Sequence, residues 1–362
     1  MKILILANND IGLYKFRKEL IQELLKKYEV YISLPYGNFV PELQRLGCIY
    51  IDTPISRRGT NPITDIRLFF NYRKILINIK PDAVLTYTIK PNIYGGSACR
   101  LAHIPYITNI TGLGTSIENA GLMQKFVFGL YRISLAKASC VFFQNEPNRK
   151  AFLDRHLLHG KTRLIPGSGV NLQQHCLEEY PSDADGLVFV FIGRIMRDKG
   201  IGELFEAAQQ IKARYPAAQF DIIGECEEDY TDQINRLNDL GIIRYYGQQN
   251  DVHTFIKNSH AVILPSYHEG TANVLLESAS SGRPILASNV TGCRETFDEG
   301  ITGFGFEARN ADSLVAAIMK FINLPHERKR LMGLSGRLKM EKEYDRNIVV
   351  DAYMEEINHF NI

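Results

Sequence analysis

Two carboxylates eight residues apart, Glu269 and Glu277, mark the segment of this chain that is richest in chemistry. The apolar run Ala261–Leu264 before them predicts a buried parallel strand, and the residues from about Ala272 to Ser281 predict a helix. A turn between a strand and a helix leaves backbone N–H groups free, and such groups bind anions. The spacing favours a turn that holds a phosphate while the two acids address sugar hydroxyls. Two surface acids at a chance spacing are the alternative.

Two other loops carry suitable groups. Arg194 and Lys199 flank a turn between Gly193 and a predicted helix, and a planar guanidinium and a compact ammonium both suit a diphosphate. Gly224 ends the apolar run of a predicted strand, where the absence of a side chain lets a ligand approach the backbone. A solvated basic turn or an ordinary glycine explains either loop alone. The three loops in this order favour one site.

Composition excludes several classes of protein. The chain has 362 residues, 45% hydrophobic and 23% charged, which predicts about two globular domains. A formal charge of +2 argues against a nucleic-acid binder. Six scattered cysteines predict reduced thiols in a cytoplasm, with neither a disulfide framework nor a zinc site. The N-terminus enters a strand without signal-peptide architecture, and no apolar run reaches the roughly 18 residues of a membrane span.

Short apolar runs alternate with helical patterns, which predicts βα units and parallel sheets. In the first half we expect strands at Lys2–Ala7, Val30–Leu34, Ile49–Ile51, Ala83–Thr86, Tyr106–Asn109, Cys140–Phe143 and Thr162–Ile165. A segment rich in Gly, Ser, Asp and Pro, Gly167–Gly186, then predicts an interdomain connection. A second series follows, with strands at Leu187–Gly193, Gln219–Ile223, Ile243–Tyr246, Ala261–Leu264 and Pro284–Ala287.

The expected architecture is therefore α/β, with two Rossmann-like doubly wound domains that face each other across a cleft. One domain comprises residues 1–168 and a returning helix within 346–362, and the other comprises residues 169–345. In such sheets ligands bind outside the carboxyl ends of the strands, where the three loops fall. A single large mixed domain is the alternative.

The C-terminal half resembles the retaining glycosyltransferases of family 4, which have the GT-B fold. The resemblance is carried by G-R-I-M-x-x-K-G, I-I-G-E, Y-Y-G-Q-Q-N-D-V and L-P-S-Y-H-E-G-T-A-N-V-L-L-E-S-A-S-S-G-R-P-I. It implies that Arg194 and Lys199 hold the donor's diphosphate, that Glu277 binds the ribose, and that Glu269 engages the donor sugar. The implied catalytic residues are Glu269, Arg194 and Lys199. The implied donor site also contains Gly12, Gly193, Gly224, Gly247, Gly270, Thr271, Ala272 and Asn273, the last four through N–H groups.

The N-terminal half resembles bacterial enzymes that assemble glycans linked to undecaprenyl diphosphate, for O-antigen, capsule or N-glycan. These include enzymes that add N-acetylgalactosamine to a bacillosamine-type sugar. The resemblance is carried by the segments that begin at Ser56, Lys90 and Thr111. It implies an acceptor site that contains Arg57, Arg58, Lys90 and Thr111.

The chain departs from the family pattern at two places. Many members have a Gly-Gly pair in the first strand-to-helix loop, whereas this chain has only Gly12 there. Many also place a histidine near the donor sugar, where this chain has the segment Asn109–Gly112, so we assign no catalytic histidine.

Asp183-Ala184-Asp185 spells the metal-binding D-x-D of another glycosyltransferase fold, but it lies in the expected connection. Because cations and helix N-termini can take the leaving charge, we expect no metal.

The segment from Ile117 to Lys137 carries an apolar stripe, including Leu122 and Phe126, with cationic edges. It fits either a helix packed in a core or one that docks on an anionic inner leaflet. The expected location is cytoplasmic and peripheral, at the inner face of a bacterial membrane.

The expected function is retaining transfer of a sugar from a UDP-sugar to a polyprenyl-diphosphate-linked saccharide, without nucleic acid. The alternatives are a UDP-sugar 2-epimerase or sugar-phosphate synthase of the GT-B fold, and a non-catalytic nucleotide-sugar-binding protein. A dehydrogenase is disfavoured because no G-x-G-x-x-G follows the first strand.

Overall fold

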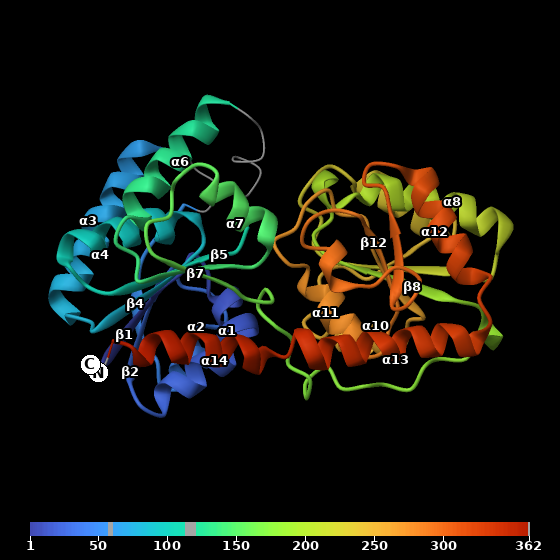
Figure 1. The fold of residues 1–362 in the computed structure, drawn as a ribbon. Helices are drawn as coiled ribbons and strands as arrows, with labels where there is room; N and C mark the ends of the chain where they lie inside the picture. The colour runs from blue at the N-terminus through green and yellow to red at the C-terminus, as the bar shows by residue number, and fades with distance from the viewer. Residues whose placement is uncertain (57–60, 113–120, 361–362) are drawn as a thin grey trace. The chain divides into compact units, whose positions relative to one another are not determined.

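A computed structural model describes residues 1–56, 61–112 and 121–360 (Figure 1). The chain divides into two compact units, Met1–Ser168 with Arg346–Ile362, and Gly169–Asp345. Each unit is built on one parallel sheet, so the predicted fold class of two doubly wound α/β units is confirmed. Two of the expected acceptor residues, Arg57 and Arg58, lie outside the described residues.

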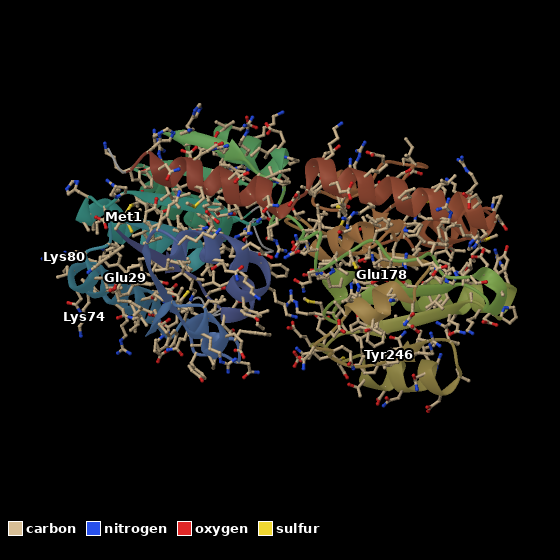
Figure 2. The ribbon with its side chains drawn as sticks, turned by 90° about the horizontal axis from the view of Figure 1, so that it is seen from below. Met1, Glu29, Lys74, Lys80, Glu178 and Tyr246 are labelled. Carbon is tan, nitrogen blue, oxygen red and sulfur yellow. The ribbon has the colours of Figure 1, made fainter. Side chains whose placement is uncertain are left out.

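The first unit contains, within the described residues, a parallel sheet of order β3-β2-β1-β4-β5-β6-β7. Met1 lies just before the interior strand β1, and its carbonyl accepts from the N–H of Glu29 at 3.1 Å (Figure 2). The strand order reverses between β1 and β4, and doubly wound sheets bind ligands at this switch point. The strands are β1 (Lys2–Leu6), β2 (Glu29–Leu34), β3 (Ile49–Asp52), β4 (Ala83–Tyr87), β5 (Tyr106–Ile110), β6 (Cys140–Phe143) and β7 (Lys161–Leu164).

Helices cover both faces of this sheet because its strands are apolar on both sides (Figure 1). Ile3 and Ile5 of β1 pack in one core with the helices α1 and α14. Leu4 and Leu6 point to the opposite face and pack with α3, α4 and α6. The helices are α1 (Asp10–Leu25), α2 (Val40–Arg45), α3 (Pro62–Ile79), a π-helical turn (Pro91–Gly95), α4 (Gly96–Ala102), α6 (Leu122–Leu135), α7 (Glu146–Leu153) and α14 (Arg346–Asn358).

The returning helix α14 completes the first unit's core. The ring of Tyr353 packs edge-on against Phe142, with ring centroids 4.5 Å apart, and its hydroxyl accepts from Asn109 Nδ2 at 2.6 Å. At the start of α14, Arg346 pairs with Glu19 of α1 at 2.9 Å. A helix distant in sequence is therefore an integral part of this unit.

The second unit repeats the same topology, with a parallel sheet of order β10-β9-β8-β11-β12-β13 among its described residues. Its switch point lies between β8 and β11, whose register aligns Ala261 with Phe189. The strands are β8 (Val188–Ile192), β9 (Gln219–Ile223), β10 (Arg244–Tyr245), β11 (Ala261–Leu264), β12 (Ile285–Ser288) and β13 (Gly303–Phe306).

The helices of the second unit pack on this sheet around one apolar core. Short 3₁₀ turns lie at Asp183–Asp185, Arg197–Lys199 and Arg294–Thr296. The longer helices are α8 (Ile201–Arg214), α9 (Thr231–Asp239), α10 (His253–Lys257), α11 (Asn273–Ser280), α12 (Ala311–Ile322) and α13 (His326–Glu343).

The segment expected to be an interdomain connection is largely part of the second unit. Arg283 is fully buried, and its guanidinium donates to the carbonyls of Glu178 at 3.3 Å and Glu179 at 2.7 Å. The hydroxyl of Tyr180 donates to the carbonyl of His260 at 2.9 Å. Since Arg283 also donates to Lys257 and Ile256, one side chain fastens this segment to the core.

We predict that Tyr353→Ala destabilises the first unit by about 3–5 kcal/mol, the usual cost of removing a large buried aromatic side chain. Urea unfolding followed by circular dichroism would measure it. Tyr36→Ala is the control, because Tyr36 is 68% exposed and its loss should change stability by no more than about 0.5 kcal/mol. Equal effects of the two changes would show that α14 contributes little to the fold.

Candidate functional site

The loop after β8 is held against the end of β11. Its 3₁₀ turn ends at Gly200, whose φ of 69° lies in the left-handed region. A Cβ added at Gly200 would lie 2.1 Å from the carbonyl oxygen of Pro265, so this approach requires glycine. The N–H of Tyr267 donates to the carbonyl of Asp198 at 2.9 Å. The loops after β8 and β11 therefore form one structure at the switch point.

Lys199 and Glu269, predicted from separate motifs, meet in this structure. Glu269 Oε1 accepts from Lys199 Nζ in an ion pair and from Ser266 Oγ at 2.7 Å. The two charged side chains are only 19% and 15% exposed. Such a pair attracts more strongly than an exposed one, because less water screens it. A direct bond between these residues was not predicted.

The loop after β12 clamps the loop that carries Glu269. Gly292 has a φ of 84°, and a Cβ there would lie 2.5 Å from the Glu269 carbonyl oxygen. The N–H of Ala272 donates to the carbonyl of Gly292 at 2.9 Å, and Ser288 Oγ donates to the carbonyl of Ser266. The N–H of Ala272 is thus used inside the protein, and its predicted contact with a ligand stays a prediction.

Helix α11 begins at Asn273 without a side-chain cap. Asn273 and the half-buried Glu277 are four residues apart, so they lie on the same face of this helix. Gly270 and Thr271 lie in the turn just before it. The predicted ligand contacts of Gly270, Thr271, Asn273 and Glu277 stay predictions.

The three glycines predicted near the nucleotide pack against one another. A Cβ at Gly224, where φ is 148°, would lie 1.8 Å from the carbonyl oxygen of Gly193. The N–H of Gly224 donates to the carbonyl of Gly247 at 2.9 Å, and Tyr245 Oη donates to that of Gly224 at 3.1 Å. Close packing of the ends of β8, β9 and β10 explains why glycine is needed at Gly224.

Arg194 is half exposed and pairs with Glu227, which follows β9, at 2.9 Å. Both predicted diphosphate ligands, Arg194 and Lys199, therefore have a carboxylate partner within the protein. A bound diphosphate would compete with Glu227 and Glu269 for these cations.

The predicted residues of the first unit are already engaged with neighbours. The N–H of Gly12 donates to Asn9 Oδ1 at 2.6 Å, which caps α1, so this N–H is used within the helix start. Lys90 pairs with Asp65 of α3 at 2.6 Å, and both side chains are 14% exposed. Thr111 is half-buried just after β5. The structure does not test whether these residues contact an acceptor.

Two family models match the chain. Residues 2–145 match "Glycosyl transferase 4-like", and residues 176–333 match "Glycosyl transferases group 1". The chain is a glycosyltransferase of the group 1 and 4-like type. The motifs around Arg194, Lys199 and Glu269 thus lie within the segment matched to the group 1 model.

Similar glycosyltransferases come from several bacteria. The N,N'-diacetylbacillosaminyl-diphospho-undecaprenol α-1,3-N-acetylgalactosaminyltransferase of Campylobacter jejuni is 27% identical, over 98% of this chain and 97% of its own. The UDP-Gal:α-D-GlcNAc-diphosphoundecaprenol α-1,3-galactosyltransferase of Escherichia coli is 26% identical, over 74% of this chain and 73% of its own. A capsular polysaccharide biosynthesis glycosyltransferase of Staphylococcus aureus is 25% identical, over 82% and 83%.

Solved structures share the GT-B fold of this glycosyltransferase. HepE of Anabaena, in complex with UDP and glucose, has a TM-score of 0.81 and 17% identity, and covers 99% of this chain and all of its own. Sucrose-phosphate synthase of Thermosynechococcus elongatus has a TM-score of 0.79 and 19% identity, with coverage of 99% and 98%.

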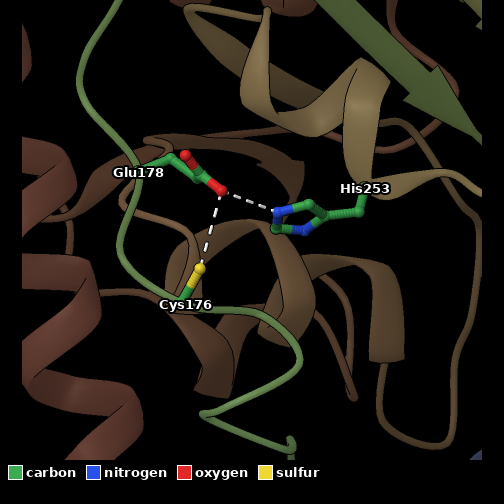
Figure 3. Close-up of side chains that lie close together, drawn as sticks. All are labelled: Cys176, Glu178 and His253. Atoms are coloured by element: carbon green, nitrogen blue, oxygen red, sulfur yellow. Dashed lines mark hydrogen bonds and ion pairs between the residues drawn. The ribbon is translucent and has the colours of Figure 1, made fainter.

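In the described part of the glycosyltransferase, one group of side chains, Cys176, Glu178 and His253, has ligand types and spacing that could hold a metal ion (Figure 3). Glu178 Oε1 lies 2.9 Å from His253 Nε2 and 3.5 Å from Cys176 Sγ. Lys257 Nζ lies 3.0 Å from the other carboxylate oxygen of Glu178. Hydrogen bonds from His253 and Lys257 lower the pKa of Glu178 to about 2. We interpret the group as an ion-pair network that fastens the segment around Glu178 to α10.

Asp183, of the D-x-D segment, likewise serves a structural role. It pairs with Lys329 at 2.7 Å and with His326 at 2.8 Å, both at the start of α13. These pairs lower the pKa of Asp183 against the opposing effect of burial. The prediction that the reaction needs no metal stays a prediction.

The sequence analysis missed Ser266 and Gly292, which position Glu269. A small residue directly after a strand and a glycine in the next strand-to-helix loop were the signals available. They are weak, because both are common in loops.

We predict that Lys199→Met and Glu269→Gln each lower kcat/KM for sugar transfer about 10²–10³-fold, as loss of one charge-stabilising group does. If the pair acts as a unit, the double variant should lose little more than either single variant. Steady-state transfer assays on all four proteins measure this coupling.

Lys257→Met is the matched control, because it breaks the ion pair with Glu178 elsewhere in the same unit. It should leave kcat/KM within about twofold of the wild type, and thermal melts should show all variants folded. Near-normal turnover in Lys199→Met or Glu269→Gln would contradict the site assignment.

Proposed function

We propose that this glycosyltransferase moves a sugar, with retention of configuration, from a UDP-sugar to a saccharide linked to a polyprenyl diphosphate. The observation that carries the proposal is the Lys199–Glu269 ion pair at the switch point of the second unit. In this pair a cation that suits a diphosphate lies beside a carboxylate that suits sugar hydroxyls. A nucleotide sugar contains both a diphosphate and a sugar, which supports such a donor.

Donor binding would proceed by exchange of ionic partners. The diphosphate takes Lys199 from Glu269 and Arg194 from Glu227, so that both cations pair with the ligand. Glu269 then becomes free to accept hydrogen bonds from the sugar. Ligand binding and release of the carboxylate are therefore coupled, and hydrogen bonds from the sugar hydroxyls replace the ion pair at Glu269.

Retention follows from substitution on one face of the sugar. Among the described residues no side chain is an evident covalent nucleophile, so we infer an oxocarbenium-like transition state with the leaving diphosphate stabilised by Arg194 and Lys199. The acceptor hydroxyl gives its proton to the departing phosphate. UDP-galactose is an α-glycosyl diphosphate, and the Escherichia coli relative is named for an α-1,3 product, which agrees with this stereochemistry.

The acceptor is proposed from the relatives' names. The Campylobacter jejuni and Escherichia coli enzymes are both named for diphospho-undecaprenol-linked acceptors. Arg57, Arg58, Lys90 and Thr111 are the proposed acceptor residues. Because Lys90 is paired with Asp65, an acceptor phosphate at Lys90 would have to displace that carboxylate.

We also propose that the enzyme works at a membrane surface, through helix α6. No helix among the described residues is long and apolar enough to cross a membrane. The stripe on α6 divides into two parts, since Tyr131 and Leu135 are buried whereas Leu122 and Phe126 are 85% and 61% exposed. The exposed Lys125 and Arg132 lie along one margin of that outer part on the helix. The location would thus be the inner, cytoplasmic face of a bacterial membrane.

The transferase proposal predicts that one UDP-sugar from a panel is consumed only in the presence of a bacterial lipid extract. Mass spectrometry of the lipid should show one added sugar, and NMR of the product should show an α linkage. A chelator should leave the rate within about twofold, because Arg194 and Lys199 supply the positive charge.

Other outcomes of the same assay would overturn the proposal. Conversion of a UDP-sugar without an acceptor would indicate an epimerase, and transfer to a free sugar phosphate would indicate a synthase. Binding of UDP-sugars without turnover would indicate a non-catalytic protein. A β-linked product would refute only the proposed retention of configuration and would leave the transferase proposal standing.

The membrane proposal predicts that the double variant Leu122→Ser and Phe126→Ser floats with vesicles roughly 10-fold to 100-fold less than the wild type, because two apolar side chains no longer enter the bilayer. The control is Leu240→Ser with Leu338→Ser, two leucines of the second unit that are 64% and 58% exposed. Equal loss in both double variants would refute a specific role for α6.

A further inference from the structure

A second helix of the first unit, α3, also exposes an apolar stripe. Ile63, Ile66, Phe70 and Ile77 are between 55% and 63% exposed. At 100° per residue they fall within a sector of about 60°, opposite the buried face of the helix. An ordinary surface helix has polar residues on that side. Helix α3 is therefore apolar on both its inner and its outer face.

Basic residues border this stripe on both sides. On the helical wheel, Arg73 follows one edge and Lys74 and Arg67 follow the other, and all three are exposed. Lys74 and Lys80 project outward at the edge of the first unit (Figure 2). An apolar band with cationic margins has the pattern of a surface that meets an anionic bilayer.

The stripe ends at a cavity of about 430 Å³, within the size range of ligand pockets. Its walls are mostly apolar and include Ile77 of α3, Leu101 of α4 and Ile104. Two cations, Arg73 and Lys80, also line it. Because Ile77 belongs to both the stripe and the cavity, the apolar surface is continuous from one to the other.

The two cations have no carboxylate partner among the described side chains. Lys80 ends α3 with a φ of 52°, a left-handed position where glycine is the usual residue. The acid nearest to it in sequence, Asp82, accepts a hydrogen bond from the N–H of Lys2 at 2.6 Å. The cavity thus combines uncompensated positive charge with an apolar wall.

We propose that this cavity binds one anionic phospholipid, with the phosphate between Arg73 and Lys80 and an acyl chain along Ile77 and the outer face of α3. The inference rests on the proposed action at a membrane and adds a lipid-specific site to it, separate from the contact through α6. The apolar walls favour a lipid over a free phosphate, because a free phosphate would leave them in water.

The site predicts that the double variant Arg73→Gln and Lys80→Gln loses the lipid. Native mass spectrometry in detergent with phosphatidylglycerol should show one lipid bound per wild-type chain. The variant should bind it about 30-fold more weakly, at roughly fivefold per basic residue. Flotation should show the same loss with vesicles of equimolar phosphatidylcholine and phosphatidylglycerol, and little change with phosphatidylcholine alone.

The control is Lys18→Gln with Lys27→Gln, which removes the same charge from α1 and the turn after it, on the opposite face of the sheet from α3. It should retain the bound lipid. Ile66→Ser with Phe70→Ser should weaken binding to both kinds of vesicle, because it shortens the apolar stripe without changing charge.

Retention of the lipid by the Arg73→Gln, Lys80→Gln variant would overturn the site. So would equal competition by glycerol phosphate, which lacks acyl chains, or dimerisation through α3 without lipid binding. Transfer to a detergent-solubilised acceptor is measured separately. A chain that binds the lipid but transfers no sugar would refute the proposed reaction and leave the lipid site standing.

Discussion

The ion pair between Lys199 and Glu269 is the interaction around which the second unit's site is arranged. It joins the loops after β8 and β11, where the strand order reverses, and both partners are largely buried. Burying opposite charges costs solvation energy, which is recovered only when geometry and extra hydrogen bonds are good. Ser266 supplies one such bond, and the clamp from Gly292 holds the loop in place. In this pair the opposite charges of Lys199 and Glu269 compensate each other until a charged ligand separates the two side chains.

Close backbone approaches allow these loops to meet. Gly200 lies against Pro265, Gly224 against Gly193, and Gly292 against Glu269, each too close for a Cβ atom. Any larger residue would push the loops apart and lengthen the distance between charges. The tolerance of the site to substitution is thus limited by the backbone as much as by the charged side chains.

The sequence was sufficient for the architecture and for most of the elements that surround the site. Alternating apolar runs and helical patterns identify the parallel sheets, because buried parallel strands need continuous apolar segments. The analysis missed β13, since its sequence, Gly303 to Phe306, is half glycine, and it missed α7, which is short and largely polar. It also assigned Gly167–Gly186 to a connection, because turn-rich composition does not reveal that the distant Arg283 fastens this segment to the core.

For the site itself, residue types were predictable but partners were not. The motifs singled out Lys199 and Glu269 separately, yet a bond across 70 residues depends on how two loops pack at a switch point. The same holds for Lys90 with Asp65 and for the N–H of Ala272, which is used inside the protein. Ion pairing and loop clamping are tertiary properties, and local spacing carries little information about them.

The position of α14 affects the order in which the chain folds during synthesis. Residues 169–345 are contiguous and are synthesised before the last helix. The first unit lacks Tyr353 until α14 has been synthesised, so Phe142 and Asn109 are without their native neighbour before then. Multidomain proteins generally fold from the N-terminus onward, whereas here the unit that begins first is completed last. A nascent chain therefore exposes an unfinished apolar groove while residues 169–345 are made.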